Sequence, residues 1–117
     1  MREKDLSEVI QSYDGFVKIL QQLSMSAESQ ICKLKGTAVA DELASDFSEI
    51  GMLYAKNLLR YGWITEEQYE LSQEIDELLE QMTQKKELWN DSALLCSVEW
   101  ENCRKKGIEL LQTLETQ

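Results

Sequence analysis

The chain of 117 residues contains no proline and only five glycines, so very little in it interrupts a helix. Proline breaks a helix interior, and glycine there costs about 1 kcal/mol relative to alanine. Leu, Glu, Gln, Lys and Ala, which favour helices, are abundant. A chain of this length can bury an ordinary core without a metal or a disulfide. We therefore predict a single all-α domain over residues 1–117.

Apolar residues recur at steps of three and four along the chain, and this spacing predicts a bundle of four main helices and one short helix. These are expected at about residues 6–23, 24–36 (a turn and the short helix), 37–61, 66–86 and 90–113. Gly15 lies inside the first helix, and its effect on continuity stays open. A break near Ser97 also stays open for the last helix.

Residues at the expected helix ends support these limits. Asp5 and Glu8 can form a capping box, and Thr37 can cap the second main helix. Gly62 suits the left-handed residue that ends a helix. Thr65 and Gln68 form a second capping box directly after it, so we expect an antiparallel hairpin of the second and third main helices.

Each main helix has an apolar stripe that should face the core. In the first helix it is Val9, Ile10, Tyr13, Phe16, Val17, Leu20 and Leu23. In the second helix it is Leu43, Phe47, Ile50, Tyr54, Leu58 and Tyr61, beside a row of small residues, Ala44, Ser48, Gly51 and Ala55, which favours tight packing. In the third it is Leu71, Ile75, Leu78, Leu79 and Met82, and in the last Trp100, Cys103, Gly107, Leu110 or Leu111, and Leu114.

Negative charge is concentrated between residues 37 and 84. That stretch holds 11 acidic and two basic side chains, Lys56 and Arg60, and so accounts for −9 of the net charge of −10. The flanking stretches 1–36 and 85–117 are nearly balanced. A local field of this sign attracts a cationic partner and repels nucleic-acid phosphates.

Several function classes lose support from what the sequence lacks. The chain has no histidine, the commonest general base and metal ligand. Cys32, Cys96 and Cys103 match no zinc or redox spacing and are interpreted as reduced core thiols of a cytoplasmic protein. No segment approaches the ~18 apolar residues of a membrane span, and the chain begins directly in an amphipathic helix. We expect a noncatalytic protein with no cofactor or metal, and with no direct nucleic-acid or membrane binding.

One short basic run, Arg104-Lys105-Lys106, stands out in the last helix. It is too short for a phosphate-binding surface on a chain of this net charge. We interpret it as a solvated helix face that pairs locally with Glu101 or Glu109.

Projection of the acidic stretch on a helix at about 100° per residue shows which of its side chains share one side. Four glutamates then form one exposed ridge opposite the leucine-rich core face: Glu66, Glu70, Glu74 and Glu77. Tyr69 projects between Asp76 and Glu80, either as the hydrophobic staple partner of Ile64 or as an aromatic anchor among acids. Asp46 and Glu49 on the second helix would add a second acidic surface. The ridge is either a docking surface for a basic protein or an ordinary solvated face.

The chain resembles the small, acidic, all-helical immunity proteins of bacterial polymorphic and contact-dependent toxin systems. The resemblance rests on the turn Gly62-Trp63-Ile64-Thr65-Glu66-Glu67 and on the segment from Trp89-Asn90-Asp91 through Glu99-Trp100 to Arg104. It implies an antitoxin that binds and blocks a secreted, often basic toxin domain such as a nuclease. It carries over no individual functional residue.

The leading hypothesis is therefore an inhibitor, a monomer or small oligomer, that docks the acidic hairpin on a basic toxin. Electrostatic complementarity would come from Glu66, Glu70, Glu74 and Glu77. Tyr69 would be the anchor of the interface, and Asp46 and Glu49 would lie at its rim. The main alternative is an adaptor or secretion-chaperone-like module that binds through apolar surface. The third hypothesis is a nucleic-acid mimic, and the last is a hydrolase with paired carboxylates.

Overall fold

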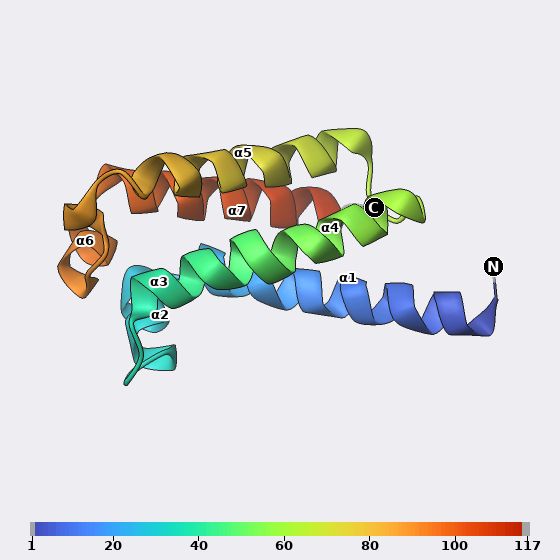
Figure 1. Ribbon diagram of the computed structural model, residues 1–117, viewed down its shortest axis with the longest axis horizontal. Helices are drawn as coiled ribbons and strands as arrows, with labels where there is room; N and C mark the ends of the chain where they lie inside the picture. Colours follow the sequence, from blue (N-terminus) through green and yellow to red (C-terminus); the bar gives the residue numbers. More distant parts are fainter. Residues whose placement is uncertain (1, 116–117) are drawn as a thin grey trace.

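The computed structural model describes residues 2–115, which fold into an all-α bundle and contain no strand (Figure 1). Its helices are listed in chain order: α1 (Glu3–Ser24), α2 (Ala27–Lys33), α3 (Val39–Ser45), η1 (Asp46–Gly51), α4 (Met52–Arg60), α5 (Glu66–Met82), η2 (Lys86–Leu88), α6 (Asp91–Cys96) and α7 (Val98–Glu115). Because α3, η1 and α4 follow one another without a gap, they form a single helical run. No helix within this part of the chain is long and apolar enough to cross a membrane.

Four helices build the bundle. Around its axis, α1 packs on α4, α4 on α5, α5 on α7, and α7 on α1 (Figure 1). The short helices α2 and α6 pack on each other at one end. The α1–α4 edge and the α5–α7 edge therefore lie on opposite sides of the molecule.

Helix α1 is continuous through Gly15, which settles the open question about this residue. A Cβ added to Gly15 would lie 2.8 Å from Cζ of Tyr54 on α4. The glycine thus makes room for the tyrosine ring, and the packing offsets its low helix propensity. Most of the predicted apolar stripe of α1 faces the core, with Val9, Phe16 and Leu20 fully inaccessible, but Ile10 is wrong, because it is 43% exposed.

The second predicted helix contains a π-turn, η1, that the sequence pattern did not reveal. A π-turn accommodates an extra residue and rotates everything after it. The buried line therefore runs through Gly51 and Ala55, whereas Ile50, predicted to be buried, is 43% exposed. A Cβ on Gly51 would lie 3.3 Å from Ile19 of α1, so the predicted role of the small residues in tight packing is confirmed here.

The ends of this helical run test two predictions. Gly62 has a φ of 72°, the left-handed conformation expected of a terminator. The cap at Thr37 is wrong, because α3 starts at Val39 and the Thr37 hydroxyl donates to the carbonyl of Leu34 instead. After Gly62 the chain reverses, so that α4 and α5 form the antiparallel hairpin seen in Figure 1.

The last predicted helix is divided at Ser97 into α6 and α7. Asn90 caps α6 by accepting from the amide of Ala93 at 2.8 Å, and the Ser97 hydroxyl accepts from the amide of Trp100 at 3.2 Å. The predicted inward line of α7 is confirmed: Trp100, Cys103, Gly107, Leu110 and Leu114 are all buried. Gly107 lies against Ser24 of α1, where a Cβ would collide with the serine hydroxyl.

Candidate protein-binding surface

Helix α5 carries the predicted acidic residues, and its first turn fixes how it is rotated. The Thr65 hydroxyl accepts from the Gln68 amide at 3.1 Å, and the Gln68 side-chain oxygen accepts from the Thr65 amide at 2.8 Å, so the capping box is confirmed. The side-chain nitrogen of Gln68, which is buried, also donates to the hydroxyl of Thr113 on α7 at 3.2 Å. This one side chain starts the helix and ties it to its neighbour.

The inward face of α5 follows from that anchor. Gln68, Ser72, Ile75, Leu79 and Met82 are buried. The predicted Leu71 and Leu78 are only partly buried, at the margin of the core. The glutamates are left on the outward side of the helix.

All four glutamates of the predicted ridge, Glu66, Glu70, Glu74 and Glu77, are exposed. A shallow hollow on this side of α5 is lined by Glu67, Glu70, Leu71, Gln73, Glu74 and Glu77. Glu67 thus belongs to the surface although we did not include it among the predicted site residues. Its projection, only about 20° from that of Glu74, could have placed it there. We call Glu66, Glu67, Glu70, Glu74 and Glu77 the acidic row.

One cation from outside the helix reaches the acidic row. Lys106 on α7 lies 3.8 Å from a carboxylate oxygen of Glu74, and half of the glutamate side chain is exposed. Exposed pairs of this kind stabilise a fold by about 0–1 kcal/mol. Within residues 2–115 this is the one ion pair of the acidic row, which keeps most of its negative charge unbalanced.

Tyr69 does not line the hollow of the acidic row. Its side chain is half-buried and packs against the hydrophobic core. In the hairpin turn that precedes α5, Trp63 makes an edge-on contact with Tyr13 of α1, with ring centroids 5.9 Å apart. The position of Tyr69 gives it a packing role, and its anchor role stays a prediction.

Asp46 and Glu49 lie away from the acidic row. The Asp46 carboxylate accepts from the side-chain amide of Gln22 on α1 at 2.9 Å. It therefore faces the α1–α4 edge, opposite the α5–α7 edge at which Glu74 meets Lys106. Glu49 is exposed one turn further along the same helical run. The structure does not join the two predicted acidic surfaces into one.

The interpretation of the basic run is right for Lys105 and wrong for the other two residues, because Lys106 pairs with Glu74 on α5 and not with Glu101 or Glu109. Lys105 pairs locally with Glu101 at 3.7 Å as expected. Arg104, however, is half-buried and donates to the side-chain oxygen of Gln30 at 3.3 Å and to the carbonyl of Leu94 at 3.0 Å. It links α7 to α2 and α6 and is not a solvated surface residue.

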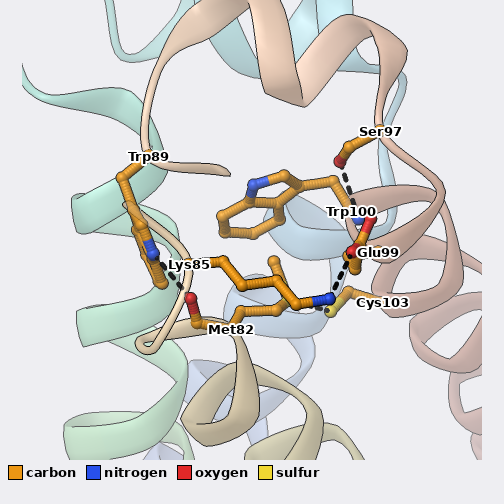
Figure 2. A network of polar contacts seen from close by, with 7 residues as sticks. All are labelled: Met82, Lys85, Trp89, Ser97, Glu99, Trp100 and Cys103. Carbon is orange, nitrogen blue, oxygen red and sulfur yellow. Dashed lines mark hydrogen bonds and ion pairs between the residues drawn. The ribbon is translucent and has the colours of Figure 1, made fainter. Parts of the chain in front are cut away.

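Figure 2 shows the polar contacts where α5 meets α7. The indole of Trp89 donates to the carbonyl of Met82 at 2.9 Å, and Lys85 pairs with Glu99 at 3.1 Å. Hydrogen bonding by its own backbone amide, and then by Lys85, lowers the pKa of Glu99. These contacts hold the α5–α7 connection together. Residues 2–115 also contain no cluster of three acidic or cysteine side chains suited to a metal ion.

The cysteines differ in their expected reactivity. Burial raises the pKa of Cys103 to about 12, and its thiol donates to the Met82 sulfur at 3.7 Å. Cys32 and Cys96 are exposed, which corrects the prediction that they are core thiols. With a disulfide reagent at pH 8, we expect two thiols to react rapidly and Cys103 only on unfolding. Replacement of Cys103 by Ala should leave the fast phase unchanged, and a third rapid thiol in the native protein would contradict this prediction.

Comparison of this chain with protein-family models, with curated proteins and with solved structures finds no match.

Proposed function

We propose that this protein is a noncatalytic inhibitor that binds a cationic protein through the acidic row of α5. The observation that carries the proposal is that five exposed glutamates share one side of an anchored helix, and that residues 2–115 supply them with a single, solvent-exposed ion pair. Like charges one turn apart repel by a few tenths of a kcal/mol per pair. A basic partner would relieve that repulsion on binding.

The anchoring of α5 supports recognition in addition to solubility. The capping box and the bond from Gln68 to Thr113 fix the helix, so the carboxylates are held in place before a partner arrives. Groups that are already ordered lose less conformational entropy on binding. An acidic surface also raises the rate of encounter with a basic protein.

The finer proposal is an immunity protein that neutralises a basic toxin domain such as a nuclease. A nuclease must attract the phosphates of its substrate and so presents a cationic surface. An acidic row that covers such a surface would compete with nucleic acid for it. The all-α bundle and its acidic helix agree with this reading.

One observation favours the alternative of an adaptor that binds through apolar surface. Leu95 and Val98, which flank the break at Ser97, are 48% and 66% exposed. Apolar docking at this end of the bundle should survive 0.5 M NaCl, whereas docking through the acidic row should weaken as salt screens the charges.

The test is charge reversal with a control of equal net charge. Partners captured from lysate at low salt are identified, and association rates are then measured with the purified partner at several salt concentrations. The variant Glu70→Lys/Glu74→Lys should associate at least about tenfold more slowly and with a flatter salt dependence.

The control, Glu87→Lys/Glu109→Lys, changes the net charge equally at two exposed glutamates outside the acidic row. It should have a much smaller effect on the association rate. If both double variants associate at the same rate, the acidic row is not the docking surface.

A further inference from the structure

The outward face of the α3–η1–α4 run carries an apolar residue between opposite charges. Leu53 is 67% exposed, the highest value among the large hydrophobic side chains of residues 2–115. Glu49 precedes it by four residues, and Lys56 and Arg60 follow it by three and seven. All three charged side chains are exposed, so one helix face is acidic at one end, apolar at its centre and basic at the other end.

The charges on this face are not satisfied within the molecule. Among residues 2–115, neither Glu49 nor Lys56 nor Arg60 takes part in an ion pair. Arg60 places its guanidinium 5.6 Å from the ring centroid of its neighbour Tyr61.

This pattern is complementary to itself when two copies run antiparallel. With a rise of about 1.5 Å per residue, Glu49 lies about 6 Å from Leu53 along the axis, and Lys56 lies about 4.5 Å on the other side. In an antiparallel pair centred on Leu53, each Glu49 therefore faces the Lys56 of the second copy.

A hollow beside this face can receive side chains of the second copy. It lies between α1 and α4 and is lined by Glu8, Gln11, Ser12, Leu53, Tyr54, Lys56, Asn57 and Arg60. Leu53 forms part of its wall, so the leucine of the second copy reaches apolar contact there. The charged residues of the lining border this contact with polar groups, as at the rim of protein interfaces.

We propose that two copies of this chain associate through the outward face of α3–η1–α4, antiparallel about a twofold axis near Leu53. Twofold dimers in which the same surface serves both subunits are the commonest oligomers. One helix face is small beside the roughly 1,200–2,000 Å² that stable complexes bury, so the dimer is weak and sensitive to salt. The proposal does not depend on the proposed function, because the acidic row lies on the opposite edge.

The sharpest test uses two variants that each abolish the pairing but restore it together. Glu49→Lys places lysines on both sides of each contact, and Lys56→Glu places glutamates on both sides. Each variant alone should sediment as a monomer at concentrations where the unchanged protein is dimeric. In an equimolar mixture every contact is again between opposite charges, so a heterodimer should form.

Leu53→Glu provides an independent variant with a matched control. We expect it to raise the dissociation constant of the dimer by at least about tenfold, since it removes the apolar centre and adds like charges. Val98→Glu changes a side chain of nearly equal exposure on α7 and should leave dimerisation unchanged. Circular dichroism verifies that all variants are folded.

Three results would overturn the proposal. The unchanged protein could remain monomeric up to about millimolar concentration, a range in which even weak pairing is measurable. It could dimerise without sensitivity to Leu53→Glu, which would place the contact on another face. The mixture of Glu49→Lys and Lys56→Glu could stay monomeric, which would exclude the antiparallel register.

Discussion

Replacing Trp100 by Ala is expected to lower the free energy of unfolding by about 3–5 kcal/mol, the cost typical of deleting a buried aromatic side chain. Trp100 is completely inaccessible, and its ring packs edge-on against that of Trp89 with centroids 5.5 Å apart. Its indole nitrogen also donates to the carbonyl of Leu88 at 2.7 Å. The substitution therefore leaves both a cavity and an unpaired buried carbonyl.

Urea unfolding followed by circular dichroism measures this effect without relying on tryptophan fluorescence. Trp100→Phe separates the two contributions, because it keeps most of the apolar volume and removes only the donor. We expect this variant to lie between the unchanged protein and Trp100→Ala. Since small domains are stable by only about 5–15 kcal/mol, Trp100→Ala should also lower the urea concentration at the midpoint of unfolding measurably. A loss below about 1 kcal/mol would mean that Trp100 is not a core residue.

The second large effect is expected for Gln30→Leu, at a loss of about 2–4 kcal/mol from unmade buried hydrogen bonds. Gln30 is fully buried, and its side-chain nitrogen donates to the carbonyls of Gln22 at 3.1 Å and Leu23 at 2.9 Å, near the end of α1. Its oxygen accepts from Arg104. Leucine has a similar volume but can make none of these bonds, so two carbonyls and a guanidinium lose a partner.

A matched control for Gln30 lies close by in the chain. Gln21 is exposed on α1, and Gln21→Leu should change the unfolding free energy by less than about 0.5 kcal/mol. Equal stability of the two variants would show that the hydrogen bonds of Gln30 make no net contribution to the free energy of unfolding. Arg104→Met tests the other end of the same network and should be destabilising as well, because it leaves the Leu94 carbonyl without its donor.

The features that could be predicted from the sequence were those decided by residues close together in the chain. Thr65 and Gln68 signal their helix start within one turn, and Gly62 signals the end before it. The core line of α7 was predicted because its spacing is regular from Trp100 to Leu114, and the structure decides between Leu110 and Leu111 in favour of Leu110. Local chemistry specifies such ends and faces before any tertiary contact forms.

The features that were missed depend on contacts between distant segments. The π-turn at Asp46–Gly51 accompanies the close fit of Gly51 on Ile19 and of Tyr54 on Gly15, and no local pattern encodes that fit. Arg104 meets Gln30, which lies 74 positions away. The rotation caused by the π-turn also exposes Ile50, whose spacing had suggested burial.

The candidate surface also contains residues whose positions could be predicted from the sequence and residues whose positions could not. The exposure of Glu66, Glu70, Glu74 and Glu77 followed from one helical projection, because α5 is a regular helix. That Lys106 reaches Glu74, and that Asp46 turns toward α1, depend on how the helices are arranged around the bundle axis. The separation of Asp46 and Glu49 from the acidic row could not be predicted without that arrangement.

The packing of α1 on α7 has a consequence for how this protein folds. These helices are the first and the last of the bundle, and their contact is the most extensive between any two of its helices. During synthesis on the ribosome, α1 emerges with its apolar stripe about 75 residues before the start of α7, since α1 ends at Ser24 and α7 begins at Val98. Contacts of such long sequence separation form late, because a long loop must close before they stabilise anything. The hairpin of α4 and α5, with its short connection, can form first and give α1 a partial partner until α7 completes the core.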